Sequence, residues 1–284
     1  MRTIECLAPV SGGYRLTRTV ELDSLFPSLP GKEAGQEADI ESLDVAEGCL
    51  WLCGSHALTR RAQGKLGRDR VDPKIRKRPS RRLLGWVALG ENGGAVTTPG
   101  QAFAFKGPGS LRALVRDDPY LAPFMDLPSK ENGFDIEGLA VVRRKLYLGL
   151  RGPVIDGIAI ILAMSMPTQG SVRPAPPVLH FLDLGGGGVR DLTRWQDGML
   201  VLAGPVTSSD APFALFHWKP QRTGKIQKPR HLRDFPAGLD HPEGICVLRR
   251  ENSEGLVVVY DTRNRTRTAG TRYRADWFGS VQAP

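Results

Sequence analysis

Three short stretches share one pattern, and this pattern decides the predicted fold: Asp39-Ile40-Glu41-Ser42-Leu43, Asp135-Ile136-Glu137-Gly138-Leu139 and Asp240-His241-Pro242-Glu243-Gly244-Ile245. An apolar run typical of a β-strand follows each stretch. A carboxylate that recurs at one place in a structural repeat is expected to recur at one place in space. In a β-propeller that place is the central channel, so the pattern predicts a propeller in which three glutamates converge.

The spacing of the glutamates predicts the number of blades. Glu137 follows Glu41 by 96 residues and precedes Glu243 by 106 residues, and each interval suits two blades of ~40–50 residues. Within the second interval, residues 148–154 are echoed by residues 201–206, about one blade further along. The full chain of 284 residues therefore predicts an all-β propeller of about five to six four-stranded blades, forming one domain over residues 1–284.

Short apolar runs support this all-β interpretation. Five of them are rich in β-branched or aromatic residues and end at Gly, Asn or charged residues: 49–53, 145–148, 199–202, 213–218 and 256–260. No stretch keeps helical apolar spacing for three turns without Gly or Pro. A β-sandwich is the alternative architecture, but it does not explain the repeat. The first residues look like the middle of a strand, which predicts an N-terminal truncation and an unusual ring closure.

The net charge of +9 is concentrated in one segment. Residues 60–82 contain eleven Arg or Lys and two Asp, which leaves the rest of the chain neutral. The simpler interpretation is a solvated loop inserted between strands. The alternative is an arm that binds an acidic protein partner or phosphate. Since no aromatic residue lies within 60–82, we do not expect nucleic-acid binding.

Composition also bears on location. The longest uncharged apolar stretch is too short to span a bilayer, and the first residues lack the apolar core of a signal peptide. Cys49 and Cys53 would lie about 13 Å apart on one strand, too far for a disulfide. These features predict a cytoplasmic protein with buried free thiols and no membrane association.

Several motifs resemble a bacterial family, domain of unknown function 3616. They are Ala38-Asp39-Ile40-Glu41, Leu52-Cys53-Gly54-Ser55-His56, Arg81-Arg82-Leu83-Leu84, Asp135-Ile136-Glu137-Gly138-Leu139, Gly149-Leu150-Arg151-Gly152-Pro153, Val189-Arg190-Asp191-Leu192, Leu202-Ala203-Gly204-Pro205 and His241-Pro242-Glu243-Gly244. The resemblance extends over about residues 35–260 and implies a β-propeller without an assigned activity. The Pro242-Glu243-Gly244-Ile245 turn is also similar to turns of calcium-dependent propellers of the phytase-like, gluconolactonase-like and strictosidine-synthase-like groups, a likeness at the level of the fold.

The carboxylates have two interpretations of equal weight. As metal ligands, Glu41, Glu137 and Glu243, with Asp135 on the same face of its strand as Glu137, would suit Ca²⁺ or Mg²⁺. As structural groups, each glutamate would accept backbone N–H bonds from a neighbouring blade and lock the blades together.

His56, Arg151 and His241 are the remaining candidate site residues. His56 follows a strand end, where it would act as a general base or contact an anion, and a structural histidine is equally expected. Arg151 would either pair with Glu137 or orient an anionic ligand, and the corresponding unit has Ala203 in its place. His241, close to Glu243, is a further ligand-binding candidate.

Two functions remain open from the sequence. The first is a propeller that binds a small anionic ligand in its channel and, with a divalent metal, hydrolyses an ester, lactone or phosphoester. In that reaction His56 or a metal-bound water would serve as base or nucleophile, and Arg151 would orient the substrate. The second is a non-catalytic scaffold that binds another protein through one face and the basic loop 60–82. Whether the protein is an enzyme is not decided by the sequence.

Overall fold

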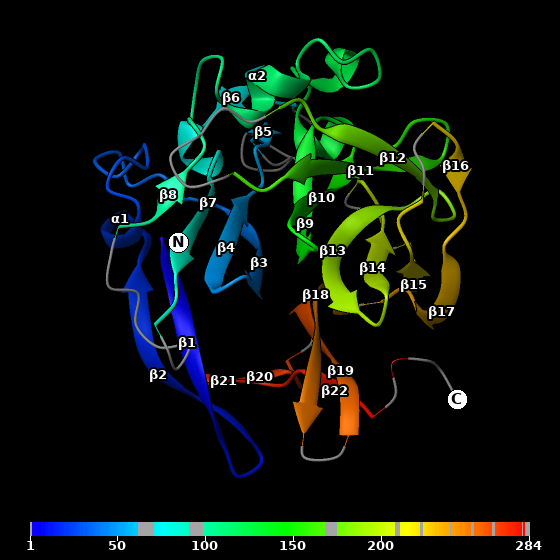
Figure 1. Ribbon diagram of the computed structural model, residues 1–284. Coiled ribbons are helices and arrows are strands. Elements are labelled where there is room, and N and C mark those ends of the chain that lie inside the picture. The colour runs from blue at the N-terminus through cyan, green and yellow to red at the C-terminus, as the bar shows by residue number, and fades with distance from the viewer. Residues whose placement is uncertain are drawn as a thin grey trace.

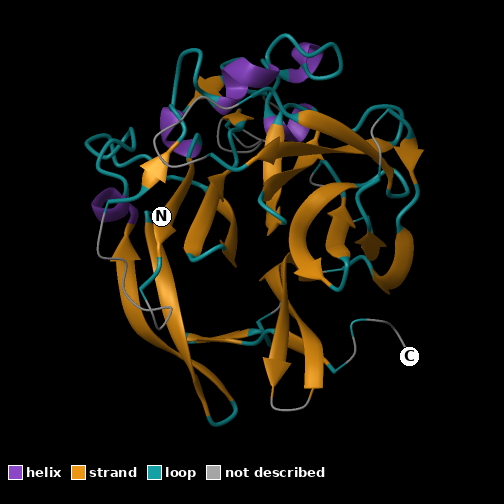
Figure 2. Cartoon of the chain, in the orientation of Figure 1, coloured by secondary structure: helices purple, strands orange, loops and turns teal. Residues whose placement is uncertain are grey.

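The protein is an all-β ring, seen here in a computed structural model (Figure 1). The structure describes residues 2–61, 71–90, 99–167, 175–207, 211–221, 224–238, 240–250, 253–262, 265–279 and 281. Four sheets of three or more strands stand around a common centre in a propeller-like arrangement, and strands dominate the described chain (Figure 2).

Sheets 1 and 2 are antiparallel meanders whose first strand is innermost. Sheet 1 contains β3 (Ile40–Ala46), β4 (Cys49–Gly54), β7 (Leu84–Ala88) and β8 (Gln101–Ala102). Sheet 2 contains β9 (Asp135–Val142), β10 (Lys145–Gly152), β11 (Ile158–Ser165) and β12 (Val178–Asp183), and the short β16 (Ile226–Gln227) adds to it in parallel. The apolar runs 49–53 and 145–148 form β4 and β10, as the sequence predicts.

Sheets 3 and 4 continue the same order around the ring. Sheet 3 contains β13 (Gly188–Trp195), β14 (Gly198–Gly204), β15 (Phe213–Trp218) and β17 (Arg230–Phe235). Sheet 4 contains β18 (Asp240–Arg250), β19 (Ser253–Thr262) and β22 (Asp276–Phe278), so three described strands build it. The remaining predicted strands lie in β14, β15 and β19, which confirms the interpretation of the short runs rich in β-branched or aromatic residues.

The prediction of five to six blades is not confirmed, because the described chain forms four such sheets. The interval from Glu137 to Glu243 does contain two units, sheets 2 and 3. Among its described residues, the interval from Glu41 to Glu137 contains one sheet of three or more strands, sheet 1. Its second half holds instead the short helices α2 (Leu111–Val115), η2 (Ala122–Phe124) and η3 (Ser129–Glu131), so interval length did not count blades there.

Smaller elements lie outside the four sheets. A long hairpin of β1 (Thr3–Val10) and β2 (Gly13–Glu21) leads into α1 (Leu22–Leu25). The pair β5 (Leu58–Thr59) and β6 (Arg76–Lys77) closes the base of the basic loop, followed by η1 (Pro79–Arg81). Near the end, β20 (Thr268–Ala269) pairs with β21 (Arg272–Tyr273).

Apolar side chains between consecutive sheets form the core. One cluster joins sheet 1 to sheet 2 around Trp51 and Leu148, the next joins sheet 2 to sheet 3, and a third joins sheet 3 to sheet 4 around Leu202 and Val258. A fourth packs α1 and the base of the β1–β2 hairpin against sheet 1. Within the described residues, no core cluster joins sheet 4 back to sheet 1, so the ring is open at this point.

The cysteines and helices answer two further expectations. All four cysteines are free thiols, but only Cys53 is fully buried, and Cys6 and Cys246 are exposed. The prediction of buried thiols is therefore wrong for these two. Among the described residues, no helix is both long and apolar enough to cross a membrane.

Candidate functional site

The innermost strands of the four sheets carry a β-bulge at equivalent positions. In each strand one residue is skipped in the register with its neighbour, and the skipped residues are Glu41, Glu137, Arg190 and Glu243. A bulge leaves its extra residue unpaired and redirects the side chain. The glutamate pattern of the sequence is therefore a repeated bulge, and its fourth copy is an arginine.

Arg190 joins three sheets through ion pairs at the centre of the ring. Its Nε lies 2.9 Å from Glu137 Oε2 of sheet 2, and its Nη2 pairs with Glu243 Oε1 of sheet 4. Burial raises the pKa of Glu137 above its ordinary value, although Arg190 and Arg151 both pull it down. Removing one partner of such a buried pair is strongly destabilising, because the other charge stays buried without compensation.

Arg151 makes the pairing with Glu137 that its position suggested. Its Nη1 donates to Glu137 Oε1 at 2.6 Å, and its Nη2 lies 2.8 Å from Asp135 Oδ2. On sheet 1, Arg81 pairs with Asp39 at 2.7 Å. We call these groups the ring-centre cluster: Asp39, Glu41, Arg81, Asp135, Glu137, Arg151, Arg190 and Glu243.

Glu41 is the exception in the ring-centre cluster, because it forms no ion pair with any described residue. Its carboxyl group is largely buried, and its electrostatic neighbours include Glu137, Asp39 and Asp135. Burial and these like charges raise the pKa of Glu41 to about 10. Glu41 is therefore protonated at neutral pH. Since its folded-state pKa is raised, the stability it contributes is present at low pH and is lost as the pH rises through that value.

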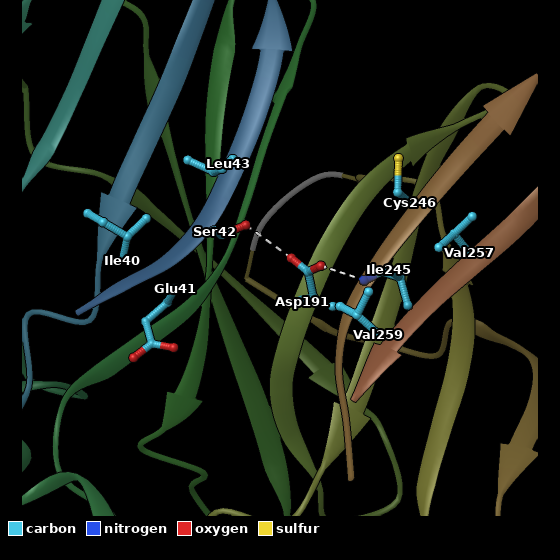
Figure 3. Close-up of a pocket in the computed structure, with 10 residues that line it drawn as sticks. Ile40, Glu41, Ser42, Leu43, Asp191, Ile245, Cys246, Val257 and Val259 are labelled. Atoms are coloured by element: carbon cyan, nitrogen blue, oxygen red, sulfur yellow. Dashed lines mark hydrogen bonds between the residues drawn. The ribbon is translucent and has the colours of Figure 1, made fainter. Parts of the chain in front are cut away.

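A second set of buried contacts connects all four sheets. Ser42 Oγ donates to Asp191 Oδ1 at 3.0 Å and accepts the Leu139 N–H of sheet 2, also at 3.0 Å. Asp191 Oδ2 accepts the Ile245 N–H of sheet 4 at 2.8 Å (Figure 3). We call Ser42 and Asp191, with these two backbone donors, the four-sheet hub. Burial raises the pKa of Asp191 to about 7, while hydrogen bonds from Ile245, Leu192 and Ser42 pull it down.

The four-sheet hub sits one residue after each bulge. Sheets 1 and 3 place the polar residues Ser42 and Asp191 there, and sheets 2 and 4 place Gly138 and Gly244. A Cβ on Gly138 would lie 2.8 Å from Leu192 Cγ and 3.1 Å from Leu192 N. Glycine is thus required at 138 because β9 and β13 approach closely, which brings the next backbone N–H within reach of Ser42.

The carboxylates do not fit a metal ion as they are arranged. In the described part of the chain, no group of three His, Cys, Asp or Glu residues is placed to hold a metal. Both oxygens of Glu137 face guanidinium groups, and Asp135 and Glu243 each have an arginine partner. A cation ligated by these oxygens would have two arginines as immediate neighbours, which opposes its binding.

The two histidine candidates have different surroundings. His56 is buried with a left-handed backbone (φ 55°), and its carbonyl accepts a bond from Arg112. Burial, together with the charges of Arg112 and Arg82, lowers the pKa of His56 to about 3, a value poorly matched to a general base near neutral pH. His241 stacks on Phe213, with ring centroids 5.8 Å apart.

The basic loop 60–82 is described only at its ends, because residues 62–70 lie outside the described residues. Several of its cations are already paired. Arg60 pairs with Glu131 and Arg76 with Asp72, both at 2.6 Å, and Arg81 belongs to the ring-centre cluster. Lys74 and Lys77 are exposed. The charge available to a partner from the described ends is therefore smaller than the composition suggests.

A cavity of about 280 Å³ lies where the ring is open, between β3 of sheet 1 and β18 and β19 of sheet 4. Glu41, Ser42 and Leu43 line one side, and Ile245, Cys246, Val257 and Val259 line the other, with Asp191 between them (Figure 3). We call this feature the opening. Its walls are largely apolar, and Leu43 and Val259 remain 45% and 41% exposed.

Sequence reasoning did not single out Arg190, Ser42 or Asp191 as site residues. One signal could have found the first: Arg190 lies 53 residues after Glu137 and 53 residues before Glu243, the repeat distance itself. A search restricted to carboxylates could not detect it. Asp191 follows directly in the chain, but its partners Ser42 and Ile245 come from two other sheets, and no local pattern indicates them.

Together, the strand order and the repeated bulges define a propeller-like all-β ring with an ion-paired centre. The chain belongs to the family described as protein of unknown function (DUF3616), whose model matches residues 1–275. Among curated proteins, no significant match exists. A solved structure, Kluyveromyces lactis Hsv2, is similar with 12% identity and a TM-score of 0.27, over 87% of this chain and 62% of that one. The chain thus spans less than two thirds of that protein's length.

Proposed function

We propose that this chain is a non-catalytic protein-interaction scaffold, whose ring-centre cluster and four-sheet hub hold the sheets in place. The observation that carries the proposal is the pairing of the carboxylates. Asp135, Glu137 and Glu243 each bind a guanidinium group, so the groups that would hold a metal are engaged in ion pairs, within sheet 2 through Arg151 and between sheets 2, 3 and 4 through Arg190. The same pairs engage Arg151, which would otherwise orient an anionic ligand.

Support for catalysis is correspondingly weaker. A metal-assisted hydrolase needs a ligand set with open positions and a group that can accept a proton near neutral pH. His56 has a pKa of about 3 and is buried, and the arginine partners oppose a cation among the carboxylates. A scaffold needs none of these groups, and it uses the outer surface and the basic loop 60–82. We keep a cytoplasmic location and a single domain as parts of this proposal.

Thermal unfolding with and without divalent cations tests the proposal. Chelated wild-type protein is compared with protein in excess Ca²⁺ or Mg²⁺, alongside Glu137→Ala and the exposed control Asp126→Ala. If the proposal holds, the wild type has the same Tm in all three buffers. Glu137→Ala then has a lower Tm than the wild type in each of them. A cation-specific rise in Tm that Glu137→Ala abolishes would refute the proposal, because a ligand stabilises the state that binds it.

Binding of a small ligand at the ring centre is the second candidate function, and Glu41 is the observation that favours it. A buried carboxyl group without an ion pair, beside three other carboxylates, gains by exchanging its proton for a cation. Divalent Ca²⁺ or Mg²⁺ remains the cofactor to test there. The discriminating variant is Glu41→Gln: it removes a cation-dependent rise in Tm if Glu41 binds the ion, and it leaves the melting behaviour in the three buffers alike if the scaffold proposal holds.

A further inference from the structure

The opening and the β1–β2 hairpin are two apolar surfaces that the ring itself does not cover. On β3, alternation directs Ser42, Asp44 and Ala46 toward sheet 2 and leaves Leu43 and Val45 on the side of the opening, where they are 45% and 54% exposed. On sheet 4, Cys246 is exposed, and Val257 and Val259 line the same cavity. The wall on sheet 4 is thus a face without a neighbouring sheet, and on sheet 1 Leu43 and Val45 remain uncovered beside the cluster that packs α1 and the base of the hairpin against the same face.

The hairpin is anchored at its base and uncovered toward its tip. Ile4 and Val20 pack into the cluster that covers sheet 1, and the two strands continue past the ring (Figure 1). Toward the tip, Leu7 pairs with Leu16 and Pro9 pairs with Tyr14, so the four side chains share one face. Leu7, Leu16 and Tyr14 are 55%, 49% and 46% exposed. A two-stranded hairpin is marginally stable alone in water, so this one gains from a further surface.

The hairpin and the opening also carry ionisable groups of opposite type. Arg15 and Arg18 lie on the hairpin, and neither forms an ion pair with a described residue. Glu41 lines the opening and likewise has no ion pair among the described residues. A cation that reaches Glu41 would favour its charged form. The hairpin therefore offers an apolar strand pair with two free cations, and the opening offers apolar walls with one carboxyl group.

We propose that two copies of this chain form a dimer in which the β1–β2 hairpin of each copy occupies the opening of the other. Because one chain carries both the hairpin and the opening, a two-fold axis satisfies both surfaces at once, as closed homodimers require. The inserted hairpin stands between sheet 4 and sheet 1, where the ring lacks a core cluster. This inference goes beyond the proposed function, since it names a partner and a surface that the scaffold proposal does not use.

Light scattering coupled to gel filtration tests the dimer, over a dilution series from about 100 µM to about 1 µM. The hairpin variant Leu7→Glu/Leu16→Glu and the opening variant Val259→Glu each place charge on one surface. The control Val178→Glu/Ile226→Glu places charge on exposed apolar residues of β12 and β16, away from both surfaces. Unchanged circular dichroism and thermal unfolding of the dilute proteins confirm that every variant is folded, and Tyr14→Ser provides a milder hairpin variant.

We expect the wild type and the control to be dimers, the hairpin and opening variants to dissociate at least tenfold more readily, and an equal mixture of the two variants to form a heterodimer. The mixture retains one intact hairpin and one intact opening, which is the contact that the proposal requires. A monomeric wild type would overturn the proposal. So would a dimer that survives both variants, or a mixture that stays monomeric, because the hairpin and the opening would then not meet.

Discussion

Replacement of Asp191 by alanine should separate the four sheets more than any exposed substitution does. The variant leaves the buried Ile245 and Leu192 N–H groups without their acceptor and removes the bond from Ser42. Each buried donor left unsatisfied costs about 1–3 kcal/mol. Burial raises the pKa of Asp191 to about 7, so ionisation of its carboxyl group lowers the stability of the wild type at higher pH. The variant lacks this carboxyl group, which offsets part of its loss of stability there. We expect a net loss of about 2–4 kcal/mol in the free energy of unfolding.

Urea unfolding at pH 8, followed by tryptophan fluorescence, measures this loss as a lower midpoint with an unchanged slope. Asp126→Ala is the matched control, because Asp126 is exposed and pairs only with the exposed Arg116. A loss below about 1 kcal/mol for Asp191→Ala would refute the reasoning, since it would mean that the four-sheet hub does not hold the sheets together.

Three further predictions concern single residues. Glu41→Gln should raise Tm relative to wild type more at pH 9 than at pH 5. In the wild type the unfolded chain releases the Glu41 proton above its ordinary pKa, whereas the folded protein holds it up to about pH 10, so the wild type alone loses stability as the pH rises over this range. Equal shifts at both pH values would contradict the raised pKa. In urea unfolding, Gly138→Ala should destabilise the fold by about 1–3 kcal/mol, because the added Cβ would meet Leu192. The control Gly109→Ala should not, because its Cβ would lie 3.6 Å from its nearest neighbour. Equal losses for the two variants would refute the close approach at Gly138. Imidazole NMR should show no titration of His56 between pH 5 and 8, and a midpoint within that range would restore it as a candidate base.

The sequence predicted the type of fold better than the number of its units. Local signals such as the apolar run 49–53 identify strands, because a short apolar run that ends at a glycine is a pattern of neighbouring residues, and the second half of this strand is buried. The number of blades depended on an interval length, and the helices at 111–131 occupy chain that the prediction assigned to strands. The length of the interval between two motifs therefore predicts the number of blades only where the whole interval folds into blade strands.

For the ring centre, sequence predicted which carboxylates gather and offered the Arg151–Glu137 pair, but it did not predict the pairs of Arg190. The repeat places Glu41, Glu137 and Glu243 on equivalent bulges, as the shared motif indicated. Their partners differ because Arg190 replaces glutamate in the third copy and Arg151 extends from the next strand. Arg151 and Glu137 belong to one sheet, whereas the pairs of Arg190 bring together side chains from three sheets, so the latter follow from the arrangement of the sheets rather than from any one motif.

The coupling between Arg190 and Glu137 tests the structural role of the ring-centre cluster most directly. Urea unfolding of Arg190→Met, Glu137→Gln and the double variant gives the interaction free energy between the two residues, which lie 2.9 Å apart. If the pair joins sheets 2 and 3, the double variant should be more stable than the sum of the single losses predicts by at least about 1.5 kcal/mol, because it leaves no charge unpaired between them. Losses that add within about 0.5 kcal/mol would contradict the account, and the glutamates would then be available for another role.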